Sequence, residues 1–211
     1  AAAPPADAAW AVFFLTGENA LPRMLELVSR GADWNPPTLH LLLWFAMRGV
    51  GLDQLTPTFL HTFSLLFVAA ALCFMYFTLR RRFDRLPALA GVLAVAAQAL
   101  VIRHAFEGRF YGPWLFFAAA FVWVLGSDAG RSSRRRDITL AIIAVFLCSI
   151  HWYGVFSLGL IALGVLIAWR STMRQAIRLL LPSAVGVVAL ALLAPIALSQ
   201  RASAAPVLWV H

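Results

Sequence analysis

The stretch that decides the fold is TPTFLHTFSLLFVAAALCFMYFTLRRRFDR, residues 56–85. Its first part, 56–79, contains no charged side chain, whereas 80–85 contains four arginines. An α-helix needs about 20 apolar residues to cross a hydrocarbon core of about 30 Å. Arginines accumulate in the cytoplasmic loops that flank such helices. We therefore predict a membrane-spanning helix that ends in a cytoplasmic turn at 80–85.

The composition of the whole chain also indicates a membrane protein. Hydrophobic residues make up 62% of the 211 and charged residues 12%, whereas a soluble domain carries about 45–50% apolar and about 25% charged residues. The net charge of +8 does not indicate nucleic acid, because the arginines form short bridges between apolar runs and no continuous stripe. The expected partner is the lipid bilayer, with no nucleic acid.

Outward from 56–85, the apolar pattern predicts six spanning helices. Their ranges are 56–79, 86–103, 110–126, 138–151, 154–170 and 176–198. The uncharged run 138–169 would reach roughly 50 Å as one helix, at about 1.5 Å per residue, so we expect the polar break HWYG at 151–154 to divide it. The predicted fold class is all-α, a polytopic membrane bundle.

Arginine counts predict which ends of these helices face the cytoplasm. The bridges RRRFDR (80–85), GRSSRRRD (130–137) and RSTMRQAIR (170–178) carry four, four and three arginines. The positive-inside rule places all three in the cytoplasm, where they also attract anionic lipid. The other side then receives residues 1–55, the loop 104–109, the break at 151–154 and the tail 199–211.

The first 55 residues are predicted to form an extracytoplasmic segment. Residues 35–51 must begin and end outside, because 56–79 enters the membrane from there, so we expect a juxtamembrane or re-entrant helix. Two short amphipathic helices within 9–30 are expected to lie flat on the outer leaflet. The predicted domains are this segment (1–55), the bundle (56–198) and an extracytoplasmic tail (199–211).

Four ionisable residues stand together in IRHAFEGRFYG, residues 102–112, between two apolar runs. They are Arg103, His104, Glu107 and Arg109, and all lie on the predicted outer side. Ionisable groups at a membrane face are functional candidates. Two alternatives stay open: Arg103 can be an anchor that reaches to the lipid surface, and an ion-pair network can simply pin the loop.

Five short segments follow one another along the chain. They are Asp7-Ala8-Ala9-Trp10, Asn35-Pro36-Pro37-Thr38-Leu39-His40, Arg80-Arg81-Arg82-Phe83, Glu107-Gly108-Arg109-Phe110-Tyr111 and Ile150-His151-Trp152-Tyr153. In order and spacing they resemble the GT-C glycosyltransferases that use polyprenyl-phosphate sugar donors, the family-39, mannosyltransferase and aminoarabinose-transferase-like group. The resemblance covers residues 7 to 211.

The chain departs from that group's pattern at two positions. Ala8 stands where the group usually has Glu, and Asn35 stands where it usually has His. The pattern also calls for a helix that ends close to Asp7 and for a C-terminal part beyond the sixth span. We therefore expect the sequence to be incomplete at both ends relative to that group.

The resemblance implies a GT-C-like transmembrane module that transfers a sugar from a polyprenyl-phosphate donor. The reaction would take place on the periplasmic face of a bacterial inner membrane. Asp7 would be the general base, and Glu107 the second acid. The two would also hold a divalent metal ion if one takes part. The substrate-binding residues would be Arg103 and Arg109 as phosphate clamps, together with His104, Tyr111 and His151.

Other interpretations stay open beside this one. Asp7 can be the N-cap of a helix that starts at Ala8, Glu18 can be the catalytic acid instead, and Tyr111 can belong to an interfacial aromatic belt. The second functional hypothesis is a non-catalytic membrane subunit of a larger complex, whose partners are other membrane proteins. Convergence of the two acids and the two arginines on one cavity would favour the enzyme.

Overall fold

The computed structural model describes residues 21–22, 26, 36–53, 56–106, 110–127 and 133–204. Within these ranges every regular element is a helix, so the all-α fold class is confirmed there. The α-helices are α3 (Pro37–Gly49), α4 (Pro57–Arg80), α5 (Arg85–Ala96), α6 (Ala99–Phe106), α7 (Tyr111–Ser127), α8 (Arg134–Ile150), α9 (Gly154–Ala168), α10 (Met173–Leu180), α11 (Ala184–Leu192) and α12 (Ala194–Ala204), with the 3-10 turns η1 (Arg170–Thr172) and η2 (Leu181–Ser183).

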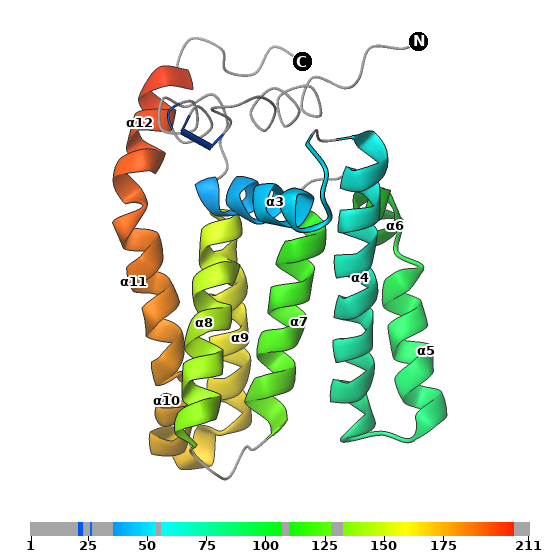
Figure 1. The fold of residues 1–211 in the computed structure, drawn as a ribbon. Coiled ribbons are helices and arrows are strands. Elements are labelled where there is room, and N and C mark those ends of the chain that lie inside the picture. The colour runs from blue at the N-terminus through cyan, green and yellow to red at the C-terminus, as the bar shows by residue number, and fades with distance from the viewer. Residues whose placement is uncertain are drawn as a thin grey trace.

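The long helices stand side by side, and α3 lies crosswise over one end of them (Figure 1). Helix α4 packs mainly against α7, and α11 packs mainly against α8. We call the end that α3 covers the α3 end; α6 and the start of α4 also lie there (Figure 1). The opposite end, with the turn between α4 and α5, the start of α8, and α10, is the α10 end.

Two helical stretches are long and apolar enough to cross a membrane. Pro57–Arg80 has a mean hydropathy of 2.0 and Arg170–Leu192 one of 1.8. The helices Arg85–Ala96, Tyr111–Ser127 and Gly154–Ala168 are apolar but shorter. By length and composition alone, these stretches support a membrane protein.

Local chemistry accounts for the starts of α4 and α8. The hydroxyl of Thr56 accepts a hydrogen bond from the Phe59 backbone N–H at 3.1 Å, and Pro57 occupies the first turn, where its missing N–H costs nothing. Ser133 accepts a bond from the Arg136 backbone N–H at 3.2 Å in the same way. These capped starts place α4 and α8 within a few residues of the predicted segments 56–79 and 138–151.

The predicted helix 86–103 is wrong as a single element, because it divides at Ala97 and Gln98. The Gln98 side chain donates to the carbonyl of Ala94 at 3.4 Å, while the Gln98 backbone N–H bonds to Val95 at 3.1 Å. A side chain that bonds to a main-chain carbonyl takes the place of a main-chain N–H and interrupts the helical hydrogen-bond pattern. The chain therefore restarts as the separate helix α6 at Ala99.

The predicted helix 176–198 also divides, and α10, η2, α11 and α12 share its length. Pro182 lies in η2, and Pro195 is the second residue of α12. Proline lacks the N–H that the ladder needs and clashes with the carbonyl four residues earlier. The two prolines thus explain why one apolar run becomes several shorter helices.

An arginine ties α4 to α7 at the α10 end. Arg81 donates to the carbonyl of Trp123 at 2.6 Å, and its guanidinium lies 5.2 Å from the centroid of the Trp123 ring. Guanidinium groups over indole rings gain a cation–π attraction. Arg81 is therefore one of the arginines that predict a cytoplasmic turn, and it also holds the end of α4 against the last turns of α7.

Helices α11 and α8 approach so closely that only glycine fits between them. A Cβ on Gly186 would lie 2.6 Å from the carbonyl oxygen of Ala144. We expect Gly186→Ala to destabilise the protein by about 1–3 kcal/mol through overpacking. The matched control is Gly159→Ala in α9, where a Cβ meets nothing within 4 Å. Thermal unfolding in detergent, followed by circular dichroism, compares the two; equal melting temperatures would contradict the prediction.

Candidate functional site

A cluster of apolar side chains fixes α3 on the bundle. Residues 39, 43 and 47 repeat every fourth position, which places them on one face of α3. We call this cluster the α3-end cluster; its buried members are Leu39, Leu43, Met47, Leu60, Phe63, Phe110 and Ile150. They come from α3, α4, α8 and the residue before α7, so four parts of the chain meet there.

The centre of the site is a ring stack between Phe110 and His151. Their ring centroids are 3.7 Å apart, and the planes differ by 19°. The ring centroid of Tyr111 lies 4.1 Å from that of Phe110, and the ring centroid of Tyr153 lies 4.7 Å from that of His151. The stack thus joins the start of α7 to the break between α8 and α9, two segments about 40 residues apart in the sequence.

A main-chain hydrogen bond determines which nitrogen of His151 carries the proton. The Tyr153 backbone N–H donates to Nδ1 of His151 at 3.0 Å. An accepting Nδ1 is unprotonated, so the neutral ring carries its proton on Nε2. The stack on Phe110 also fixes the plane of the ring, so the direction of the Nε2–H is set by the same contacts.

The other predicted site residues fall into two groups. Arg103 is exposed on α6, at the α3 end of the bundle. His104 belongs to the same helix, but its side chain lies outside the described residues, as do Asp7, Glu107 and Arg109 altogether. The structure therefore brings Tyr111 and His151 together, and the predicted convergence of the two acids with the arginines stays a prediction.

No metal centre is visible in the part of the chain that the structure describes. There, no three His, Cys, Asp or Glu side chains come close enough together to hold an ion. The two carboxylates that the sequence offers for a divalent ion, Asp7 and Glu107, are not among those residues.

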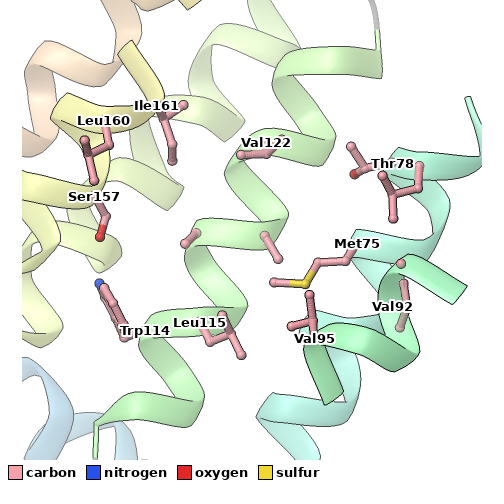
Figure 2. A pocket seen from close by; sticks show the side chains of 14 residues that line it. Met75, Thr78, Val92, Val95, Trp114, Leu115, Val122, Ser157, Leu160 and Ile161 are labelled. Carbon is pink, nitrogen blue, oxygen red and sulfur yellow. The ribbon is translucent and has the colours of Figure 1, made fainter. Parts of the chain in front are cut away.

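An apolar groove runs between α4, α5, α7 and α9 (Figure 2). Its volume is about 480 Å³, and most of its lining is aliphatic, from Met75, Val95, Leu115 and Leu160 among others. Its few polar groups are the hydroxyls of Thr78 and Ser157 and the indole of Trp114. A concave, mostly apolar site of this size suits the hydrocarbon part of a ligand.

Trp114 connects this groove to the α3-end cluster. It lies one turn after Tyr111 on α7, packs against that cluster, and lines the groove. Its Nε1–H is buried and has no hydrogen-bond partner among the described residues. In Figure 2 the indole nitrogen points toward Ser157. A buried donor of this kind is costly unless a ligand supplies the acceptor.

The groove could not be predicted from the sequence, because a tryptophan at position 114 is equally typical of the aromatic belt at a membrane interface and of a groove lining. The alanines at 118 and 119, which leave room on the groove side of α7, were the signal available in the sequence. Comparisons of this chain with models of protein families, with curated proteins and with solved structures found no match. The arrangement itself can hold an apolar chain in the groove and a polar head near His151.

Proposed function

We propose that this chain is the membrane module of a glycosyltransferase that takes a sugar from a polyprenyl-phosphate donor. The acceptor would lie on the extracytoplasmic face of the membrane. The observation that carries the proposal is the meeting of three motif segments at the α3 end. The start of α3 after Pro36, the pair Phe110 and Tyr111, and the pair Ile150 and His151 pack on one another there.

The proposal includes a polytopic arrangement in the bacterial inner membrane, with the α3 end outside. Large apolar side chains on α4, α9 and α11 are exposed, among them Leu66, Leu160 and Leu192 at 65%, 70% and 76%. Apolar surface of that extent is stable against lipid. The arginine bridges at 80–85 and 170–178 flank the α10 end, which fits a cytoplasmic location.

The groove supports a lipid-linked substrate. In the proposed complex the polyprenyl chain lies along the groove, and its phosphate and sugar reach the α3 end past Trp114. The indole N–H of Trp114 then donates to an oxygen near the head of the donor. The other end of the groove, at Leu79 and Val122, lies toward the α10 end, where α4 ends at Arg80.

The reaction would form a bond between the acceptor oxygen or nitrogen and the anomeric carbon of the sugar. The bond between that carbon and the phosphate oxygen breaks at the same time, and the polyprenyl phosphate leaves. A carboxylate, Asp7 or Glu107, would take the acceptor proton. The negative charge on the leaving phosphate would be stabilised by Arg103, Arg109 and the Nε2–H of His151.

A transfer assay tests the function directly. Membranes that contain the full gene product are supplied with a radiolabelled polyprenyl-phosphate sugar, and label is followed into products that no longer carry the lipid. Transfer above that of membranes without the protein is expected. Label that stays on the donor, together with co-purification of a second membrane protein, would instead favour the non-catalytic subunit.

Filling the groove should weaken donor binding. We expect Ala118→Phe to raise the KM for a long-chain donor about tenfold or more, because the new ring displaces several methylene groups of the chain, each worth about 0.8 kcal/mol. A donor with one or two isoprene units should be affected much less. The matched control is Ala69→Phe on α4, an exposed alanine outside the groove lining. Equal KM changes in the two variants would remove the groove from the substrate site.

A further inference from the structure

Among the described residues, the segment 170–181 at the α10 end packs on the bundle through one of its sides. It comprises η1, α10 and the first residue of η2. Ala176 and Leu179 are buried, and α10 contacts α9 and η2. Its other sides are open to the surroundings, so their composition indicates what covers them.

The open part of this segment divides into an apolar side and a basic side. Met173, Ile177 and Leu181 are 46%, 55% and 68% exposed. Their spacing of four residues lines them up along the segment. Arg174 and Arg178 are exposed and line up beside them.

The charge of this part of the chain has one sign. Arg170 is exposed at the start of the segment and adds a third cation to Arg174 and Arg178. No Asp or Glu occurs in the sequence after Asp137. A surface of this composition is complementary to one that is both apolar and anionic.

The length of the following apolar run sets the depth of the segment. Residues 179–198 carry no charged side chain, and a helical segment needs about 20 apolar residues to cross a hydrocarbon core. Arg178 then falls at the boundary of the core, and α10 lies at the level of the headgroups. Ile167 on α9 and Val185 on α11, which come before and after the segment in the sequence, are also exposed.

We propose that residues 170–181 form an interfacial segment that docks on anionic phospholipids in the leaflet at the α10 end. Arg170, Arg174 and Arg178 pair with the phosphates, since a guanidinium group can bind two phosphate oxygens at once. The apolar side enters the acyl region between α9 and α11, as in other amphipathic helices that lie in a membrane surface. The inference rests on the membrane placement in the proposed function, and not on the transfer reaction.

Native mass spectrometry of the full chain tests this proposal. The protein is purified in detergent and titrated with dioleoylphosphatidylglycerol or with dioleoylphosphatidylcholine. We expect a several-fold preference for phosphatidylglycerol. The double variant Arg174→Gln/Arg178→Gln should lower phosphatidylglycerol affinity by roughly tenfold or more, since each arginine near an anionic surface contributes about fivefold. Its affinity for phosphatidylcholine should not change.

The matched control is Arg134→Gln/Arg135→Gln, which removes the same charge from exposed arginines at the start of α8. This variant should lose at most about twofold in phosphatidylglycerol affinity, because Asp137 in the first turn of α8 offsets part of the positive charge there. An equal loss in both double variants, or an unchanged affinity in the first, would overturn the proposal. Competition by free glycerol phosphate as effective as that by the lipid would also overturn it, because the site would then recognise a soluble anion.

Carbonate extraction separates this inference from the proposed function. Wild type and variants should stay in the membrane pellet. Release of the wild type would contradict the membrane placement, and with it both proposals. If the chain stays in the pellet and prefers phosphatidylglycerol but transfers no sugar, the transferase proposal is contradicted and the interfacial segment is supported.

Discussion

Glu107→Gln is expected to reduce sugar transfer by about 10²–10⁴-fold in kcat, the usual contribution of a general acid or base. Glutamine has nearly the same shape as glutamate but can neither take up a proton nor attract a cation. Residue 107 stands three positions before Phe110 in the sequence, and the ring of Phe110 stacks on that of His151 at the candidate site. Donor KM should change little, because the groove stays intact.

The control for this substitution is Asp84→Asn, which removes a carboxylate at the start of α5, at the α10 end. It should leave kcat within about twofold of wild type, since surface substitutions away from a site have small effects. Both variants are assayed with the radiolabelled donor under saturating conditions. Unchanged turnover in Glu107→Gln would remove this carboxylate from the reaction.

Gly154→Ala is expected to prevent correct folding of the break between α8 and α9. A Cβ at this position would lie 1.9 Å from the carbonyl oxygen of Leu147 and 2.8 Å from the Cα of Cys148. Both are main-chain atoms, so no side-chain movement relieves the contact. Overpacking of a core costs about 1–3 kcal/mol, and a clash with main chain at this distance exceeds that range.

The consequences of Gly154→Ala extend to the site, because Gly154 directly follows the segment that holds His151 against Phe110. We expect a large fall in the yield of monodisperse protein on size-exclusion chromatography, and little transfer activity in the remainder. Gly164→Ala, also in α9, is the control, because a Cβ there meets nothing within 4 Å. Wild-type yield and melting temperature for Gly154→Ala would show that the two helices do not meet as described.

The sequence predicted α4 and the break at His151 well, because strong local signals mark them. Thr56 and Pro57 form a helix start, the arginines from Arg80 onward mark its end, and the polar group at 151–153 interrupts an apolar run too long for one helix. Such signals depend on neighbouring residues only. They can therefore be read without knowing which helices touch.

The divided helices and the site could not be predicted in the same way. The amide of Gln98 interrupts its helix by a bond that composition does not reveal. The stack of Phe110 on His151 and the groove beside Trp114 depend on which helices become neighbours, and periodicity gives a helix face without its partner. The predicted roles of Asp7 and Glu107 stay predictions, and the Glu107→Gln assay addresses the second of them.

The central claim is that a polyprenyl-phosphate donor lies with its chain in the groove and its head at the α3 end. The most direct test is photo-cross-linking of the purified chain with a polyprenyl phosphate that carries a diazirine in its tail, followed by mass spectrometry of the labelled peptides. We predict labels on Leu115 and Ile161, groove residues that are only partly exposed, and these labels should be removed by excess unlabelled polyprenyl phosphate. The account would be contradicted by labels that spread evenly over lipid-exposed positions such as Leu66 and that do not respond to the competitor.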